Sequence, residues 1–226
     1  MTGALFVIVV LSVAALFAYA GVTRARSPAV VAVVLLFYLV VPAVLASQGV
    51  LDRYSPFPPP GFILGGLITL CTLVLAFSAF GSRLATGVPL AALVGFQVFR
   101  VPLEWVLHRL YSEGVIPVQM TYAGQNFDIV SGVLAAALAL WLWTGRRSVR
   151  LVAAWNIIGL VLLATIVGIA ILSSPVPFRQ FMNDPPNLLP STLPYVWLPT
   201  FLVQAALFGH LLVFRAIRVK RAAAFS

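Results

Sequence analysis

The sequence predicts an all-helical fold, a polytopic bundle of about seven transmembrane helices that forms one membrane domain over residues 1–226. Two observations support this prediction. Hydrophobic residues make up 62% of the chain and charged residues only 8%, with a mean hydropathy of +1.08. The apolar residues are also arranged in long runs, and about 20 such residues in a helix cross the ~30 Å hydrocarbon layer of a membrane.

Clusters of arginine, proline and glycine separate these apolar runs. The predicted spans are 2–22, 28–47, 61–81, 87–111, 127–144, 151–173 and 192–214. Residues 18–20 read Ala-Tyr-Ala, which resembles a signal-peptidase site. No basic residue precedes that run, however, and Arg24 and Arg26 follow it as they would follow a membrane span, so we expect a first helix there.

The loop charges predict the orientation of the bundle. Ten basic residues fall on one side and no acidic residue accompanies them: Arg24, Arg26, Arg83, Arg146, Arg147, Arg150, Arg215, Arg218, Lys220 and Arg221. The other side carries Asp52, Arg53, Arg109, Glu113, Arg179 and Asp184, which balance in sign. The positive-inside rule then predicts an outside N-terminus and a cytoplasmic C-terminus in a cell membrane.

An ionisable stripe interrupts the fourth span. Arg100, Glu104 and His108 are four residues apart and therefore share one helix face, with Gln97 one turn below them. A helix that begins near Thr86 places Arg100 ~21 Å, Glu104 ~27 Å and His108 ~33 Å from the inner boundary, which puts the stripe in the outer part of the bilayer. Pro102 is expected to kink this helix between Arg100 and Glu104.

Two interpretations of the stripe stay open. In the structural one, Arg100 and Glu104 neutralise each other and His108 reaches the head groups. In the functional one, Arg100 holds an anionic or carbonyl group while Glu104 and His108 share protons in a polar cavity. A charge at membrane depth is costly, which favours the functional interpretation.

The segment that follows, residues 113–126, is too short to span the membrane and too apolar for an ordinary loop. We expect a re-entrant or interfacial cap over the stripe that turns Gln119, Thr121, Gln125 and Asn126 toward the cavity. For Asn126 and Asp128 there is a structural alternative, because both residue types cap and stabilise helix N-termini. The candidate substrate-binding residues are Gln97, Arg100, Glu104, His108, Gln119, Asn126 and Asp128.

Two resemblances follow from these residues. The chain resembles a group of uncharacterised bacterial multi-pass membrane proteins, to which no activity is attached. The resemblance rests on Phe99-Arg100 through Glu104, then Ile116-Pro117-Val118-Gln119-Met120-Thr121, Gly124 and Asn126-Phe127-Asp128-Ile129, and it implies the cytoplasmic membrane of a bacterium. Proline-rich outer loops at 48–61 and 173–190 give the chain a three-plus-one-plus-three layout that resembles SWEET-type sugar transporters. The signature proline of the first and fifth helices in that family has no counterpart here.

Several chemistries are excluded or disfavoured by the residue types present. The sole lysine, Lys220, lies in the tail, so no retinal Schiff base can form inside the membrane. His108 and His210 are expected at different depths, which excludes a haem between them. Glu104, His108 and Asp128 make an incomplete metal site, Cys71 stands alone, and the net charge of +9 is typical of contact with lipid head groups rather than nucleic acid.

We therefore expect neither a cofactor nor a metal, and three functions remain. The first is a transporter or permease for a small molecule or ion, with a polar site in the outer half of the bilayer. The second is an accessory subunit whose stripe meets a partner helix or another copy of the chain. The third is an enzyme that acts on a lipid-linked substrate at the outer interface, with Glu104 and His108 as acid and base.

Overall fold

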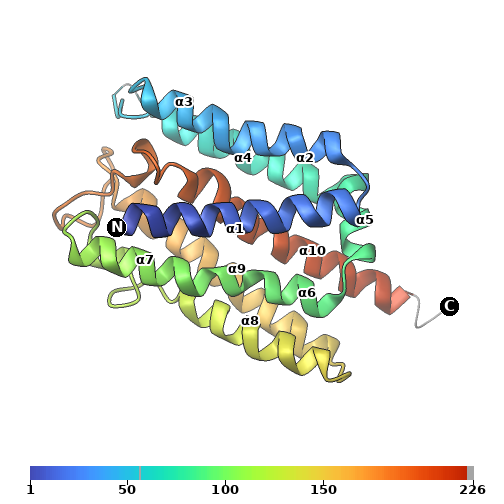
Figure 1. The fold of residues 1–226 in the computed structure, drawn as a ribbon. Helices are drawn as coiled ribbons and strands as arrows, with labels where there is room; N and C mark the ends of the chain where they lie inside the picture. The colour runs from blue at the N-terminus through green and yellow to red at the C-terminus, as the bar shows by residue number, and fades with distance from the viewer. Residues whose placement is uncertain (56, 223–226) are drawn as a thin grey trace.

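A computed structural model of the chain describes residues 1–55 and 57–222, with the backbone alone for residues 220–222. The described residues form helices joined by turns and loops, and none of them is in a strand. Pro56, one of the predicted loop prolines, lies outside the described residues, as do the side chains of Lys220 and Arg221. The fold is an all-helical, membrane-type bundle (Figure 1).

Most helices run roughly parallel to one long axis of the molecule, with Met1 at one end and residue 222, the last of the described residues, at the other (Figure 1). The first part of the chain forms α1 (Thr2–Thr23), α2 (Pro28–Leu35), the π-helical turn η1 (Leu36–Val40), α3 (Val41–Ser47), α4 (Pro60–Phe77) and α5 (Ala79–Gly87). The second part forms α6 (Leu90–Gly95), the 3₁₀ turn η2 (Phe96–Phe99), α7 (Arg100–Ser112), the 3₁₀ turn η3 (Val118–Met120), α8 (Asp128–Trp143), α9 (Val149–Leu172), the 3₁₀ turn η4 (Leu189–Ser191), the π-helical turn η5 (Leu198–Leu202) and α10 (Val203–Ala222).

Among the described residues, six helical segments are long and apolar enough to cross a membrane: Thr2–Thr23, Pro28–Ser47, Pro60–Phe77, Leu90–Ser112, Val149–Leu172 and Leu198–Val219. The segment predicted as the fifth span is shorter, because α8 has only 16 residues. At 1.5 Å per residue α8 is ~24 Å long, less than the ~30 Å hydrocarbon layer. The protein is thus a multi-pass membrane protein, and a seventh span stays a prediction.

The third predicted span, 61–81, is wrong at its inner end. Helix α4 stops at Phe77 because Ser78 has an extended ψ of 177°, and its hydroxyl accepts a hydrogen bond from Gly81 N (3.4 Å) at the start of α5. This is N-capping by a serine side chain. Arg215 donates to the carbonyl oxygens of Ala76 and Ser78. The backbone groups freed by the break are therefore partly satisfied by α10.

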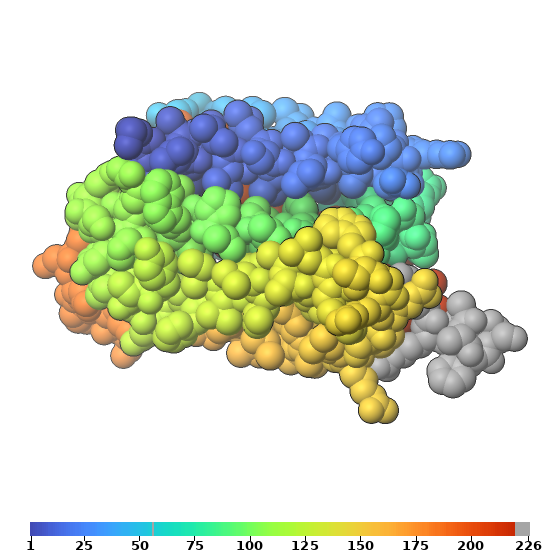
Figure 2. Space-filling model, turned by 60° about the horizontal axis from the view of Figure 1, so that its bottom comes forward, coloured from blue at the N-terminus to red at the C-terminus, as the bar shows by residue number. Residues whose placement is uncertain are grey.

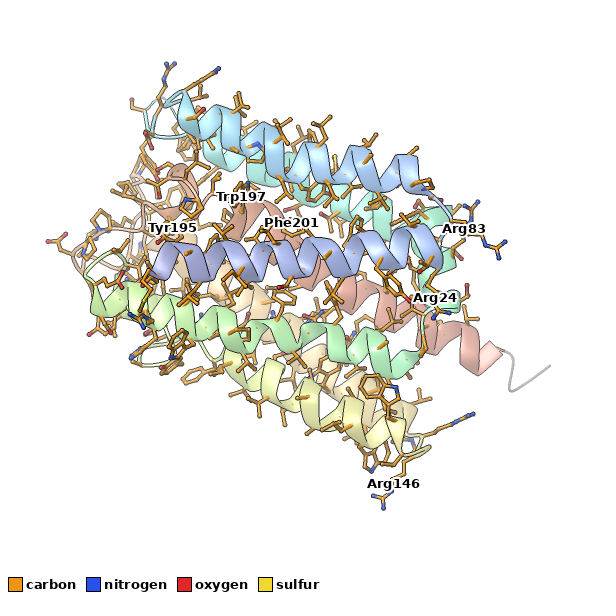
Figure 3. All side chains as sticks on the ribbon, in the orientation of Figure 1. Arg24, Arg83, Arg146, Tyr195, Trp197 and Phe201 are labelled. Carbon is orange, nitrogen blue, oxygen red and sulfur yellow. The ribbon has the colours of Figure 1, made fainter. Side chains whose placement is uncertain are left out.

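The two ends of the bundle differ in residue type. Arg24, Arg83 and Arg146 lie together at one end, whereas Tyr195 and Trp197 lie toward the other (Figure 3). These arginines are members of the basic set that the sequence predicts on one side. We call their end the arginine end and the other the loop end, which carries the long connections 48–59, 113–127 and 173–197.

The core consists of two apolar clusters stacked along the bundle axis. One cluster lies toward the loop end and includes Phe6, Ile68 and Leu202. The other lies toward the arginine end and includes Phe80, Val94 and Val213. Along one face, α1, α6 with α7, and α8 lie side by side (Figure 2). Large apolar side chains such as Leu11, Val33 and Val161 are exposed on the outside, as expected of helices that face lipid.

Candidate functional site

Helix α7 carries the predicted stripe, and the turn before it sets the stripe's position. The 3₁₀ turn η2 ends immediately before Arg100, and Pro102 lies in the first turn of α7, where a missing backbone N–H is tolerated. Gln97, Arg100 and Glu104 are 0%, 1% and 2% exposed. The stripe therefore points into the protein and not toward lipid.

Arg100 forms its ion pair with Asp128 of α8, at 2.9 Å between Nη2 and Oδ2. The structural interpretation in which Arg100 and Glu104 neutralise each other is therefore wrong. Spacing along one helix favoured Glu104, but close packing of α8 on α7 brings Asp128 opposite the guanidinium. A Cβ added at Gly132 would lie 3.2 Å from Arg100 Cβ, so this glycine permits the close approach.

The other side of the guanidinium is held by α8 and α10. Arg100 Nη1 donates to Ser131 Oγ at 2.8 Å and to His210 Nε2 at 3.3 Å. Because a guanidinium only donates, Nε2 must be the unprotonated nitrogen of His210, and Nδ1 then donates to Asn156 Oδ1 at 2.7 Å. Asn156 Nδ2 returns a hydrogen bond to the His210 carbonyl oxygen at 3.0 Å. Four helices are thus linked through one buried arginine.

Glu104 has a different partner, Asn126 in the connection between α7 and α8. Asn126 Nδ2 donates to Glu104 Oε2 at 2.7 Å and to the Met120 carbonyl at 3.1 Å, while its Oδ1 accepts from the Asp128 backbone N–H at 3.1 Å. Asn126 therefore bonds the first backbone N–H of α8 and Glu104 at the same time, and its role in a binding site stays a prediction. We call Arg100, Glu104, Asn126, Asp128, Ser131, Asn156 and His210 the polar cluster.

The 113–126 segment packs between α7 and α9 and contributes two further buried polar side chains. Gln119 Nε2 donates to Ser173 Oγ at the end of α9 at 3.0 Å, and the Thr121 hydroxyl donates back to the Val118 carbonyl at 2.9 Å. The expectation that Gln125 turns inward is wrong, because that side chain is exposed. Thr121 makes a local turn rather than a wall of a cavity.

His108 does not join the polar cluster. Its ring is half-buried and stacks on Tyr122 with the ring centroids 4.4 Å apart, and no hydrogen bond joins it to Glu104 in the described part of the chain. The expectation that Glu104 and His108 share protons is therefore wrong for this structure. Gln97 also lies apart, because its side-chain amide donates to the Ala206 carbonyl of α10 at 2.9 Å.

The depth of the stripe also needs correction. Helix α6 begins at Leu90, not near Thr86, so Arg100 lies about ten residues or ~15 Å from the start of α6 at the arginine end. Arg100 therefore lies near the middle of the helix pair α6–α7, within reach of His210, which the sequence interpretation placed far from the stripe. His210, Asn156 and Ser131 were missed as site residues because polar groups in apolar helices are more often simple helix contacts.

A cavity of about 650 Å³ lies beside the polar cluster. Its walls come from α4, α7, α9, η5 and α10, and most of its lining is apolar. The polar lining residues are Thr69, Glu104, Asp128, Ser174, Asn187, Thr200 and Gln204. Glu104 and Asp128 are the charged residues among those that line it, whereas Arg100 stands behind Asp128 and outside the lining.

The mouth of the cavity lies between α4 and α9. Gly66 on α4 and Ala164 on α9 both line the cavity and are exposed, among neighbours such as Leu67 and Val161 that are exposed and apolar. A Cβ added at Gly65 or Gly66 would meet no atom within 4 Å, so the α4 wall is open and smooth. The cavity therefore opens on the side of the bundle, among apolar side chains that we expect to face lipid.

An uncharged hydrogen-bond network borders the cavity on the side of α4. Gln204 of α10 donates to Thr69 Oγ1 at 3.1 Å and accepts from Thr72 Oγ1 at 3.0 Å. The Tyr38 hydroxyl of η1 lies 2.9 Å from Thr72 Oγ1. Gln204 therefore joins α10 to α4 and also lines the cavity.

Residues 58–218, more than half of the chain, match the family described as a domain of unknown function (DUF8737). The chain belongs to the DUF8737 family. No curated protein and no solved structure matches the chain. The DUF8737 region extends from the loop before α4 into α10 and therefore contains the whole polar cluster and nearly all of the cavity lining. In the part of the chain that the structure describes, no three His, Cys, Asp or Glu side chains gather as metal ligands would.

Proposed function

We propose that this integral membrane protein is a permease that binds a small molecule in the cavity bounded by α4, α7, α9 and α10. The observation that carries the proposal is the position of Glu104 and Asp128 on the wall of a large and otherwise apolar cavity. Ligand sites in proteins are typically apolar clefts of this size with a few polar groups that fix orientation. A buried ionisable group in a membrane bundle is by default a functional group.

The cavity lies toward the loop end of the bundle. Its lining includes Leu51, Asn187 and Leu189, which belong to connections at the loop end, while the apolar cluster with Phe80, Val94 and Val213 fills the arginine end. With the predicted orientation, the binding site lies in the outer half of the cell membrane and the inner half is closed. A permease alternates between such a state and its opposite.

The test is a flux assay in liposomes that contain the purified protein. Labelled solutes that differ in charge and size are compared between the wild type and Gly66→Phe, whose phenyl ring enters open space at the cavity mouth. Gly168→Phe is the matched control, because Gly168 also faces open space but lies outside the cavity lining. At least one solute should cross faster with the wild type and with Gly168→Phe than with Gly66→Phe. A panel in which no solute distinguishes Gly66→Phe from wild type contradicts the proposal.

The sideways opening favours a second candidate, an enzyme that acts on a lipid-linked substrate. Two carboxyl groups on one cavity wall can donate and accept protons during catalysis. Incubation of the same liposomes with lipid extracts, followed by mass spectrometry, tests this candidate. A lipid product that forms with the wild type and not with Glu104→Gln would favour the enzyme over the permease.

A further inference from the structure

We infer that the ligand of this cavity is an organic cation with an apolar body, which reaches Glu104 from the lipid through the gap between α4 and α9. The inference rests on the proposed binding role of the cavity and adds the chemical class of its ligand. Three features of the cavity carry it: the sign of its charged lining, carboxylate oxygens without partners, and the chemistry of its walls and mouth.

The charged lining has one sign. Glu104 and Asp128 line the cavity, and no arginine, lysine or histidine is among its lining residues. The nearest cation, Arg100, pairs with Asp128 and donates from Nη1 to Ser131 and His210, while its Nε and Nη2 make no hydrogen bond among the described residues. The expectation that Arg100 holds an anionic group is therefore replaced, because an anion would meet two carboxylates before it met the guanidinium.

Charge balance then favours one positive charge on the ligand. Arg100 and Asp128 cancel each other, and an ionised Glu104 leaves a single net negative charge in an environment of low dielectric constant. A buried charge of this kind is stabilised by a counter-charge. A monovalent cation makes the group neutral in place of a proton on Glu104, whereas with a neutral or anionic ligand only that proton can cancel the charge.

Two carboxylate oxygens have no partner in the described residues. Asn126 occupies Glu104 Oε2, and no hydrogen bond reaches Oε1. Asp128 Oδ2 faces Arg100, while Oδ1 is buried without a hydrogen bond, in a residue only 5% exposed. Buried carboxylate oxygens are usually hydrogen-bonded. A positively charged donor group at this place would supply the missing partners.

The remaining walls suit an apolar body. Leu103, Leu107, Leu163 and Val203 face the cavity from three helices, and the mouth opens among exposed apolar side chains. Cations with large apolar groups concentrate in membranes, because the apolar part leaves water while the charge stays near the interface. Such molecules would meet the cavity mouth by diffusion within the bilayer.

Tetraphenylphosphonium and tetraphenylborate provide a matched pair of probes, nearly equal in size and shape but opposite in charge. Binding of each labelled ion to the wild-type protein in lipid nanodiscs is measured by equilibrium dialysis, and Gly66→Phe supplies the background that comes from partition into lipid. We expect saturable binding of the cation and none of the anion above that background. Glu104→Gln, which keeps a partner for Asn126, should weaken cation binding at least about tenfold, while Gly168→Phe should leave it unchanged.

The outcomes separate this inference from the proposed function. Saturable binding of the anion, or equal binding of both ions, overturns the cation inference and leaves the cavity as a ligand site. The absence of saturable cation binding to the wild type also overturns it, and this result does not depend on any variant folding correctly. Cation binding without any flux in the liposome assay supports the inference and contradicts the permease.

Discussion

Arg100 is 1% exposed in the middle of an apolar helix pair, and its charge is stabilised by partners from two other helices, α8 and α10. Asp128 supplies the compensating charge, while Ser131 and His210 accept hydrogen bonds from the same nitrogen, Nη1. Removing one member of a buried ion pair strongly destabilises a protein, because the remaining charge stays buried without its counter-charge. The two carboxyl groups of the cluster should therefore respond very differently to neutralisation.

We expect Asp128→Asn to lower the free energy of unfolding by about 3–5 kcal/mol, because Arg100 loses its counter-charge. Glu104→Gln should change it by less than about 1 kcal/mol, because the amide oxygen of the new side chain still accepts from Asn126. Unfolding in one fixed detergent measures both variants. The double variant Arg100→Met with Asp128→Asn should recover much of the loss. Equal losses for the two single variants would show that Glu104 shares the ion pair.

Glycine positions control how closely the helices of the site approach. A Cβ added at Gly159 of α9 would collide with the His210 ring and lie 2.8 Å from Ser131 Oγ. A Cβ added at Gly168, two and a half turns farther along the same helix, would meet no atom within 4 Å. The polar cluster thus depends on a small residue at one point of α9 and not at the other.

These two glycines give a matched test within one helix. Gly159→Ala should lower the free energy of unfolding by about 1–3 kcal/mol, because the extra methyl group displaces His210 or Ser131. Gly168→Ala should leave stability unchanged or raise it by up to about 1 kcal/mol, because alanine favours a helix interior. The same detergent unfolding assay measures the free energy of unfolding of both variants. A stability loss at Gly168 as large as that at Gly159 would contradict close packing as the cause.

The helices could be predicted from the sequence better than the contacts between them could. The run from Thr2 and the run from Pro28 appear as helices within a residue of their predicted limits, because length and apolar composition suffice to define them. The end of α4 at Phe77 was missed, since Ser78 breaks the helix inside an apolar run through its own hydroxyl. Arg100 with Asp128 was missed for a different reason. Their pairing depends on the packing of two helices, which spacing along one helix does not reveal.

Residues from many segments of the chain line the cavity, and the sequence of no single segment predicts it. Its lining comes from residues between Leu51 and Leu207 that are far apart in sequence, and the two carboxylates are only part of it. The positive-inside rule predicts its side of the membrane, because Arg24, Arg83 and Arg146 lie at the opposite end from the loop-end connections (Figure 3). The orientation therefore decides whether the ligand is met from outside or inside the cell.

Single cysteines test the orientation. In a Cys71→Ala background, Ser112→Cys at the loop end and Thr144→Cys beyond α8 are both at exposed positions. A membrane-impermeant maleimide added to intact cells should label Ser112→Cys, and Thr144→Cys should be labelled only after the membrane is permeabilised, because the arginine-rich end is retained inside. Reversed labelling of the two positions would invert the topology and place the cavity in the inner leaflet.

The short helix α8 has a consequence for the membrane around the protein. Because α8 starts at Asp128 and is only ~24 Å long, an α8 that spans the membrane would leave part of the ~30 Å hydrocarbon layer beside it to the 113–126 segment. Irregular backbone at that depth must be shielded from lipid by protein. Lipid next to α8 would otherwise have to thin locally to match the helix. We therefore expect a change in the thickness of the host membrane to shift the position of Asn126, and with it the hydrogen bond to Glu104, even when no ligand is bound.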